Sequence, residues 1–244
     1  MRLRHSFKCL QRRLTPELGE IYLEDERIEA VLRRIIRTDT NCVDIGCHYG
    51  SILSRFCTLA PGGHHLAVEA IPSKVRFLRR KFPDVEVFDV ALSDHTGIES
   101  FYINLNASGF SGLAPHGKGR FKQIEVACAR FDDIVARDRR FDLLKVDVEG
   151  AELLVLRGAT WFLARNRPAV LFECGPSGPL AFGYTSGQLY DLFVAEDYSV
   201  FFLKDALNAL SPVTRADFQA ALIYPFKAFN WLALPTERHL ANSF

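Results

Sequence analysis

Residues 141–152, with the sequence FDLLKVDVEGAE, combine an apolar strand pattern with a lysine and several carboxylates. Because side chains alternate along a strand, Lys145 and Asp147 point to one face of it. A cation within a buried strand is costly unless a carboxylate or another hydrogen-bond partner meets it. Asp147 and Glu149 stand where strand gives way to helix, and open α/β sheets bind ligands at this end of their strands. The segment therefore predicts the edge of an active site.

A second segment whose residues could bind a ligand is the glycine-containing turn of residues 43–50, VDIGCHYG. Gly46 and Gly50 permit a tight turn and a close approach of the backbone to a ligand, and the helix that begins at Gly50 favours negative charge at its N-terminus. Glu69 ends the next apolar strand, where an acidic residue typically binds the two ribose hydroxyls of an adenosine cofactor. This pattern predicts a cofactor site at the same sheet edge.

The spacing of this turn bears on which cofactor it binds. The motif is D-x-G-x-x-x-G and lacks one glycine of the dinucleotide pattern G-x-G-x-x-G. A pyrophosphate would need that glycine, and the carboxylate of Asp44 would oppose a phosphate while it suits a cationic ligand. The sequence thus favours S-adenosylmethionine over NAD.

Five blocks of the chain together resemble the FkbM family of methyltransferases. The most diagnostic is LKVDVEGAEL at 144–153, followed by LRGA at 156–159. The others are VDIG at 43–46, VEA at 68–70, VALSD at 90–94 with Gly97, and VLFE at 170–173. The blocks run in order from about residue 40 to 175, whereas residues 1–35 and those after about 180 match nothing distinctive.

The resemblance implies a class I methyltransferase fold, which is a Rossmann-like α/β domain. Its seven-stranded, mostly parallel sheet has helices on both faces and ends in an antiparallel hairpin. It also implies S-adenosylmethionine as methyl donor and the O-methylation of a hydroxyl on a sugar, glycan or secondary metabolite. Its donor-binding positions fall on Asp44, Gly46, His48, Gly50, Glu69, Ala70, Asp89, Val90 and Ala91. His48 departs from the small or amide residue that is usual in the family.

Carboxylates at the two strand ends are the candidate catalytic groups. In this fold the strands that end at Asp147 and Glu173 are neighbours, so both side chains can reach one cleft. A hydroxyl with a pKa far above neutral must lose its proton as it attacks, and a carboxylate at hydrogen-bond distance can take it. We interpret Asp147, Glu149 or Glu173 as the base. Lys145 would hold a carboxylate or stabilise a developing alkoxide.

Other interpretations of these residues stay open. Lys145 and Asp147 can form a purely structural ion pair, and Glu149 and Glu152 can stabilise the following helix through its dipole. For Glu152 the structural interpretation is preferred. His48 is a less favoured base. Oxygen ligands at this edge could also hold Mg²⁺, but we favour a metal-free site and assign no metal ligands.

Composition limits the classes of function. The chain has 244 residues with 30 basic and 29 acidic side chains, so no net field favours nucleic acid. No apolar run reaches membrane-spanning length, and six cysteines without a C-x-x-C pair indicate a reduced, cytoplasmic protein. We expect a helical extension at residues 1–35 and a methyltransferase domain at 36–244. The acceptor would be a small molecule or glycan; the sequence defines neither its identity nor the oligomeric state.

Alternating apolar runs and helical patterns predict the elements that position these residues. Strands are expected at 41–46, 65–70, 85–92, 98–103, 123–128, 143–148, 169–174, 198–203 and 226–234, the last two as a hairpin. Helices are expected at 51–59, 73–82, 131–136, 151–164 and 188–196. The loop at 108–117, rich in glycine and serine, is a candidate lid over the ligand.

Two other functions compete with methyl transfer. A nicotinamide-dependent oxidoreductase could use the same cleft, although the missing glycine and Asp44 argue against it. A non-catalytic binding module on a degenerate methyltransferase fold is the other alternative, and the retained carboxylates, glycine and lysine of the two motifs argue against that.

Overall fold

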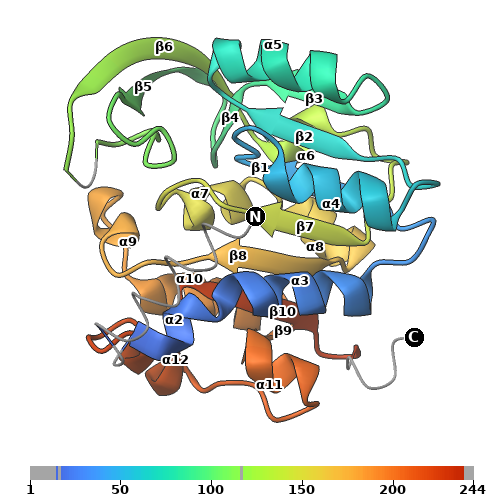
Figure 1. The fold of residues 1–244 in the computed structure, drawn as a ribbon, viewed down its shortest axis with the longest axis vertical. Helices are drawn as coiled ribbons and strands as arrows, with labels where there is room; N and C mark the ends of the chain where they lie inside the picture. The colour runs from blue at the N-terminus through green and yellow to red at the C-terminus, as the bar shows by residue number, and fades with distance from the viewer. Residues whose placement is uncertain (1–14, 16–17, 116–117, 239–244) are drawn as a thin grey trace.

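The computed structural model describes residue 15, residues 18–115 and residues 118–238. Seven strands form one sheet in the order β3-β2-β1-β7-β8-β10-β9, which runs from near the top to near the bottom of Figure 1. The strands are, in that order, Glu86–Asp89, Leu66–Glu69, Cys42–Ile45, Leu143–Val146, Ala169–Glu173, Asn230–Pro235 and Tyr198–Phe202. The first five run parallel, and β10 is antiparallel to both β8 and β9. The predicted seven-stranded, mostly parallel sheet is confirmed.

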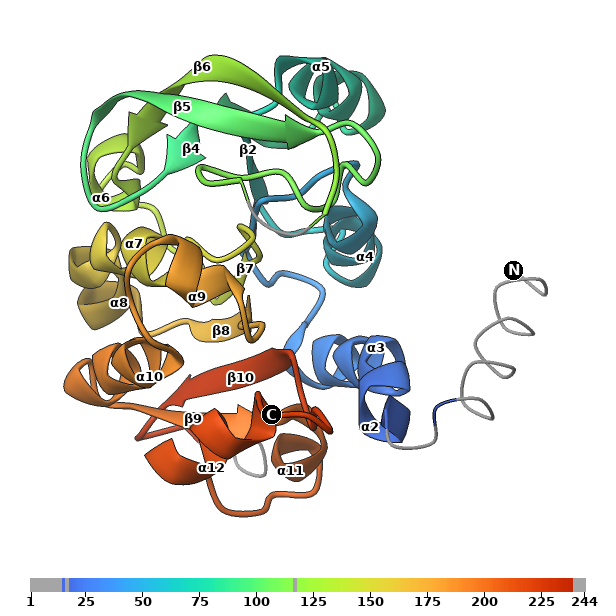
Figure 2. The same ribbon diagram turned by 90° about the vertical axis from the view of Figure 1, so that its left-hand side faces the viewer.

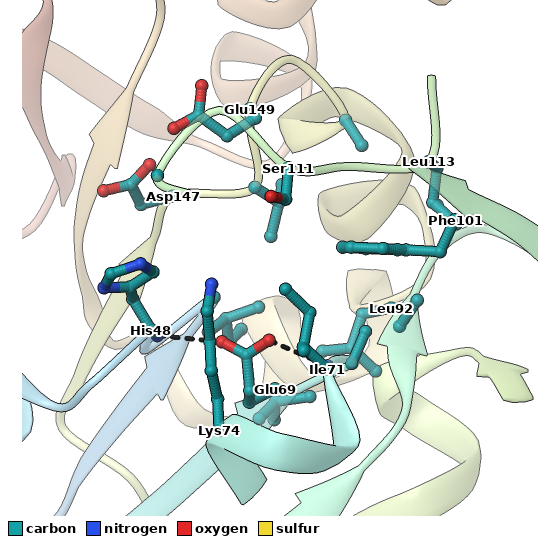
Figure 3. A pocket seen from close by; sticks show the side chains of 18 of the residues that line it. His48, Glu69, Ile71, Lys74, Leu92, Phe101, Ser111, Leu113, Asp147 and Glu149 are labelled. Atoms are coloured by element: carbon teal, nitrogen blue, oxygen red, sulfur yellow. Dashed lines mark hydrogen bonds between the residues drawn. The ribbon is translucent and has the colours of Figure 1, made fainter. Parts of the chain in front are cut away.

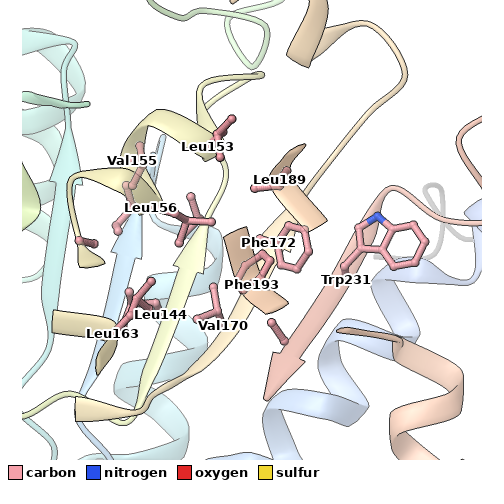
Figure 4. Close-up of a cluster of buried hydrophobic side chains, with 14 of the residues drawn as sticks. Leu144, Leu153, Val155, Leu156, Leu163, Val170, Phe172, Leu189, Phe193 and Trp231 are labelled. Atoms are coloured by element: carbon pink, nitrogen blue, oxygen red, sulfur yellow. The ribbon is translucent and has the colours of Figure 1, made fainter. Parts of the chain in front are cut away.

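Apolar residues cover both faces of this sheet, as parallel sheets require. Alternate residues of β7 and β8 face opposite sides: Leu144 and Val170 join one buried cluster, and Leu143 and Leu171 join the other. Figure 4 shows the first cluster, in which side chains from helices behind the sheet pack on Phe172 and Trp231. Both faces of the sheet are therefore buried.

Helices cover the two faces in separate groups. The cluster of Figure 4 draws on α7 (Glu152–Arg157), α8 (Thr160–Asn166), α10 (Ser186–Ala195) and α12 (Arg215–Ala221). The opposite face packs against α3 (Glu24–Ile35), α4 (Ser51–Leu59), α5 (Pro72–Lys81) and α11 (Leu203–Leu207). In Figure 1, α3 and α4 accordingly lie in front of the sheet, and α8 and α10 lie behind it. Shorter helices are α2 (Gly19–Tyr22), α6 (Phe131–Ile134) and α9 (Gly178–Ala181).

A smaller sheet of three strands stands beside the larger one (Figure 2). It has the order β4-β6-β5 and consists of Ala91–Leu92, Phe121–Ala129 and Gly97–Asn104. The single strand expected at 85–92 is thus wrong, because β3 pairs with β2 while Ala91 and Leu92 pair with Cys128 and Ala129 of β6. The loop that joins β5 to β6 reaches back toward the end of β7: a Cβ atom on Gly112 would lie 3.5 Å from Cβ of Glu149.

The helix expected at 151–164 is also divided, into α7 and α8. The backbone of Gly158 passes so close to Ser93 that a Cβ there would lie 2.1 Å from the Ser93 carbonyl oxygen. The carboxylate of Asp132 then accepts hydrogen bonds from the backbone N–H groups of Trp161 and Phe162, which lie in the first turn of α8. The break follows from this close contact and this new N-terminal cap.

The predicted antiparallel pair β9–β10 is present, but the prediction that the two strands form a simple hairpin is wrong. Phe202 faces Trp231 in the register of the pair, and the connection between the strands contains α11 and α12. At the other end of the chain, Glu24 joins α3 to β10, since its carboxylate accepts hydrogen bonds from the backbone N–H groups of Phe229 and Asn230. None of the helices within the described ranges is long and apolar enough to cross a membrane.

Candidate functional site

A cavity of about 270 Å³ opens at the carboxyl ends of β1, β2 and β7 (Figure 3). One end is apolar and is formed by Phe101, Leu92 and Leu113, whereas Asp147 and Glu149 stand at the opposite end. Glu69 lies between the two ends. The volume lies just below the usual range for small-molecule sites.

The carboxylate of Glu69 is fixed in place by the backbone of its neighbours. Its Oε2 atom accepts a hydrogen bond of 2.9 Å from the backbone N–H of His48, and Oε1 accepts one of 2.9 Å from that of Ile71. The side chain is only 5% exposed, and burial raises its pKa, opposed chiefly by the charge of Lys74. Each oxygen keeps acceptor capacity, so Glu69 can receive two further hydrogen bonds from a ligand in the cavity.

The glycine-containing turn owes its geometry to close backbone packing. Gly46 has φ +76°, and a Cβ there would lie 1.8 Å from the carbonyl oxygen of Asp147, so β1 and β7 approach each other at this point. His48 has φ +53°, an uncommon value for a residue with a side chain. This conformation directs the His48 backbone N–H toward Glu69. At Gly50, a Cβ would lie 2.6 Å from the ring of Phe82, which means that helix packing requires this glycine.

The turn after β7 is held by a buried glutamate. Oε1 of Glu152 accepts hydrogen bonds of 3.1 Å from the backbone N–H groups of Val148 and Gly150. The hydroxyl of Tyr184 donates a 2.6 Å bond to the Gly150 carbonyl. Between these contacts Glu149 adopts φ +57°, and its side chain lies at the cavity. Glu152 is therefore a structural residue that positions Glu149.

Behind the cavity, Lys145 and three acidic residues lie on one face of the sheet. Lys145 is 3% exposed, and its Nζ lies 3.0 Å from Oδ2 of Asp147. The register pairs Lys145 with Asp44 on β1 and Val146 with Phe172 on β8, so Asp147 and Glu173, the next residues of the two parallel strands, stand beside each other. Burial would lower the pKa of Lys145, but the charges of Asp147 and Glu173 outweigh it and raise that pKa. Lys145 is therefore an ammonium.

A loop from the smaller sheet covers the cavity from the other side. Ser108, Gly109, Ser111 and Leu113 line it. Two hydrogen bonds converge on Ser108: Lys74 Nζ donates to its carbonyl over 3.1 Å, and Nε2 of His48 lies 2.9 Å from its hydroxyl oxygen. Burial and the nearby ammonium of Lys74 lower the pKa of His48, so its ring is neutral at pH 7. The expected lid segment at 108–115 thus lies over the site; positions 116–117 are outside the described residues, and its movement stays a prediction.

The cavity brings together eight of the sequence-predicted site residues: Gly46, His48, Glu69, Ala70, Val90, Ala91, Asp147 and Glu149. Asp44, Gly50, Asp89, Lys145 and Glu173 do not line it. The carboxylate of Asp44 is 2% exposed and accepts a 3.0 Å hydrogen bond from the backbone N–H of Leu53, so it caps α4. Asp89 is exposed at the end of β3. A direct donor contact by either residue stays a prediction.

Sequence reasoning missed Lys74, which is 4% exposed and lines the cavity. The signal was present, because Lys74 stands one turn before the buried Leu78 on α5 and so shares its inward face. Phe101 was missed as well, since a strand pattern gives no indication that the smaller sheet would face the ligand. Among the described residues, no group of three or more histidines, cysteines or acids is arranged to hold a metal ion.

Comparison with known proteins identifies the family. A sequence profile described as the methyltransferase FkbM domain matches residues 44–200, which is more than half of the chain. The chain belongs to this family of methyltransferases. No curated protein matches it closely enough to be counted as a relative.

Two of the solved structures that this chain resembles are described as methyltransferases. The FkbM methyltransferase from Methylobacillus flagellatus KT matches with a TM-score of 0.50 and 16% identity, over 82% of this chain and 44% of that one. This chain therefore spans less than half the length of that neighbour. A TehB-like SAM-dependent methyltransferase from Corynebacterium glutamicum matches with a TM-score of 0.47 and 14% identity, over 95% of this chain and 98% of the other. The first likeness supports the class I methyltransferase fold.

Proposed function

We propose that this FkbM-family methyltransferase uses S-adenosylmethionine to methylate a hydroxyl group on a sugar, a glycan or a secondary metabolite. The order of groups along the cavity carries the proposal: an apolar end, then the fixed carboxylate of Glu69, then the carboxylates of Asp147 and Glu149 (Figure 3). S-adenosylmethionine has a matching order of adenine ring, ribose diol and cationic sulfonium.

The donor set fits this cofactor in charge as well as in order. Of the described residues that line the cavity, Glu69, Asp147 and Glu149 are acidic, and Lys74 carries the opposing positive charge. His48 adds no charge, because its pKa is lowered. A surplus of carboxylates favours a cationic ligand and opposes a pyrophosphate. Phe101 and Leu92 would contact the adenine, and Glu69 would accept hydrogen bonds from the ribose hydroxyls.

The residues at the charged end have the chemistry for proton removal. When bound, S-adenosylmethionine supplies an electrophilic methyl group on a positively charged sulfur. Asp147 and Glu149 face the space beside that end of the donor, where an acceptor hydroxyl would lie, and a carboxylate there can take its proton. The Ser108–Leu113 loop would exclude water from this space. Exclusion of nucleic acid as acceptor rests on the near-zero net charge and on the absence of an Asn-Pro-Pro-Tyr-like tetrad after β7, and it stays a prediction.

Calorimetric titration of the purified protein with S-adenosylmethionine, and separately with NAD, tests the donor assignment. We expect S-adenosylmethionine to bind and NAD not to bind. In Glu69→Ala the affinity for S-adenosylmethionine should fall by about 1.5–3 kcal/mol, or roughly 10- to 150-fold, the range for a hydrogen bond to a charged group. Glu86→Ala is the matched control, since Glu86 starts the neighbouring strand β3 and pairs with Arg139 on the surface.

Two results would overturn the proposal. Binding of NAD without S-adenosylmethionine would favour the oxidoreductase, and binding of S-adenosylmethionine without methyl transfer to any glycan or metabolite would favour a binding module. Mass spectrometry of metabolites and surface glycans, with and without the gene, identifies the acceptor.

A further inference from the structure

We infer that Glu173 is a positioning residue that stays an uncharged carboxylic acid and donates a hydrogen bond to the carboxylate of Asp147. This deepens the proposed methyl transfer and rests on it. It separates the roles of two carboxyl groups that the sequence treats as equal candidates for the base.

The first step of the argument is geometrical. Glu173 follows Phe172, the register partner of Val146 in the parallel pair β7–β8, so the side chains of Asp147 and Glu173 stand side by side on the same face. The negative charge of Asp147 and a side-chain hydrogen bond to it both raise the pKa of Glu173. Two ionised carboxylates are both acceptors and cannot hydrogen-bond to each other, so one of the pair must carry a proton.

The position of Lys145 decides which carboxyl group carries the proton. Its Nζ lies 3.0 Å from Oδ2 of Asp147, and within the described residues no other carboxylate lies within 4.0 Å of it. The side chain of Asp147 is also 34% exposed and lines the cavity, so water and the lysine both support its negative charge. Glu173 is half-buried, and no described cation lies at ion-pair distance from it. The proton therefore belongs on Glu173.

The charged groups around Glu173 support this assignment. Burial raises the pKa of Glu173 well above its usual value, and the negative charges of Asp147 and Glu149 raise it further, opposed by Lys145. On its other side, β10 presents Asn230, whose side-chain amide donates to Glu24 of α3. No described group on that side would stabilise a negative charge on Glu173.

This arrangement assigns the proton of the reaction. As the acceptor oxygen bonds to the methyl carbon and the methyl–sulfur bond breaks, the hydroxyl proton moves to Asp147, and the proton of Glu173 stays where it is. The Glu173 hydrogen bond and the Lys145 ion pair orient Asp147 toward the cavity before the acceptor arrives. Such preorganisation of a base by a second group is the general logic of catalytic pairs.

Difference infrared spectroscopy tests the protonation state without an acceptor. At pH 7 the wild type should show a carbonyl band of a protonated carboxylic acid that is absent from Glu173→Gln, with Glu152→Gln as control for the other buried glutamate. In Asp147→Asn the same band should also disappear, because Lys145 is then left with Glu173 as its counter-ion. A spectrum of Glu173→Gln identical to that of the wild type in this region overturns the inference.

Turnover separates positioning from proton transfer. Glu173→Gln keeps a neutral donor of the same shape and should retain turnover within about threefold, whereas Glu173→Leu should lose at least tenfold and Asp147→Asn about 10²–10⁴-fold. The two Glu173 variants should bind S-adenosylmethionine as the wild type does, which controls for folding. If Glu173→Gln loses as much turnover as Asp147→Asn, Glu173 is itself the base. A failure to find any methyl transfer contradicts the proposed function but leaves the infrared result intact.

Discussion

The Nζ atom of Lys145 and the Oδ2 atom of Asp147 lie 3.0 Å apart, although the lysine is 3% exposed and the aspartate reaches the cavity. The pair thus places one charge in the protein interior and the other at the edge of the candidate active site. Because the two partners differ so much in access to water, removing one should have a different consequence from removing the other.

Asp147→Leu should destabilise the protein more than Lys145→Met. Loss of the aspartate breaks the buried ion pair, and Glu173 must then lose its proton to become the counter-ion of Lys145; breaking a buried pair typically costs about 3–5 kcal/mol. Loss of the lysine leaves a carboxylate that is 34% exposed and can be hydrated. Urea unfolding of both single variants and of the double variant gives the coupling energy. Equal stability of Asp147→Leu and the wild type would mean that Lys145 reaches solvent or that Glu173 replaces Asp147 without cost.

Gly46→Ala should be strongly destabilising. The new Cβ would lie 1.8 Å from the Asp147 carbonyl oxygen at a residue with φ +76°. The backbone conformation alone costs about 1–2 kcal/mol for alanine, and the clash must also displace the end of β7. Gly97→Ala is the control, since no atom lies within 4 Å of the Cβ position there. Unfolding midpoints in urea compare the two, and a loss below 1 kcal/mol in Gly46→Ala would contradict this account.

The fold could be predicted from sequence because burial on both faces leaves a clear signal. Strands such as Leu143–Val146 are apolar runs, and the helix Ser51–Leu59 was predicted with the bounds that it has in the structure. The misplaced boundaries share a cause. Val90 and Gly158 lie inside continuous patterns, and each break depends on a contact with a distant segment, β6 in one case and Ser93 in the other.

The candidate site was predicted less completely than the fold. The motifs located the strand ends and so identified Glu69, Asp147 and Glu149, which all line the cavity. The helical spacing of Lys74 and Leu78 places that lysine on the inward face of α5, but whether Lys74 or Phe101 reaches a ligand depends on how the smaller sheet closes over the larger one. Only the three-dimensional arrangement contains that information.

Replacing Glu152 with glutamine should make stability depend less on pH. Burial raises the pKa of Glu152 from 4.5 to about 7, so the folded state binds more protons than the unfolded state between these values. Stability from this group is therefore complete below pH 4.5 and is lost as the pH rises to about 7, by about 3 kcal/mol. A glutamine at this position can still accept from the backbone N–H groups of Val148 and Gly150 and never ionises.

The measurement is the free energy of unfolding from pH 5 to pH 8 for the wild type and Glu152→Gln. The difference between them should grow with pH in favour of the variant. The buried carboxyl of Asp44 also has a pKa raised to about 7, but it is common to both proteins and cancels in the difference. Parallel curves would mean that Glu152 is ionised in the folded protein throughout this range.

Amide variants of the two cavity carboxylates test which one takes the proton. Asp147→Asn and Glu149→Gln preserve size and shape, so they change charge and proton transfer while packing stays the same. Loss of a general base typically lowers turnover by about 10²–10⁴-fold and leaves donor affinity nearly unchanged. Because Asp147 has the support of Lys145, we expect the large loss in Asp147→Asn and a smaller one in Glu149→Gln. Normal turnover in both variants would make the two carboxylates structural.

The same assay with a chelator tests the metal alternative. Wild-type turnover should persist, and its abolition would assign these oxygens to a bound Mg²⁺ ion.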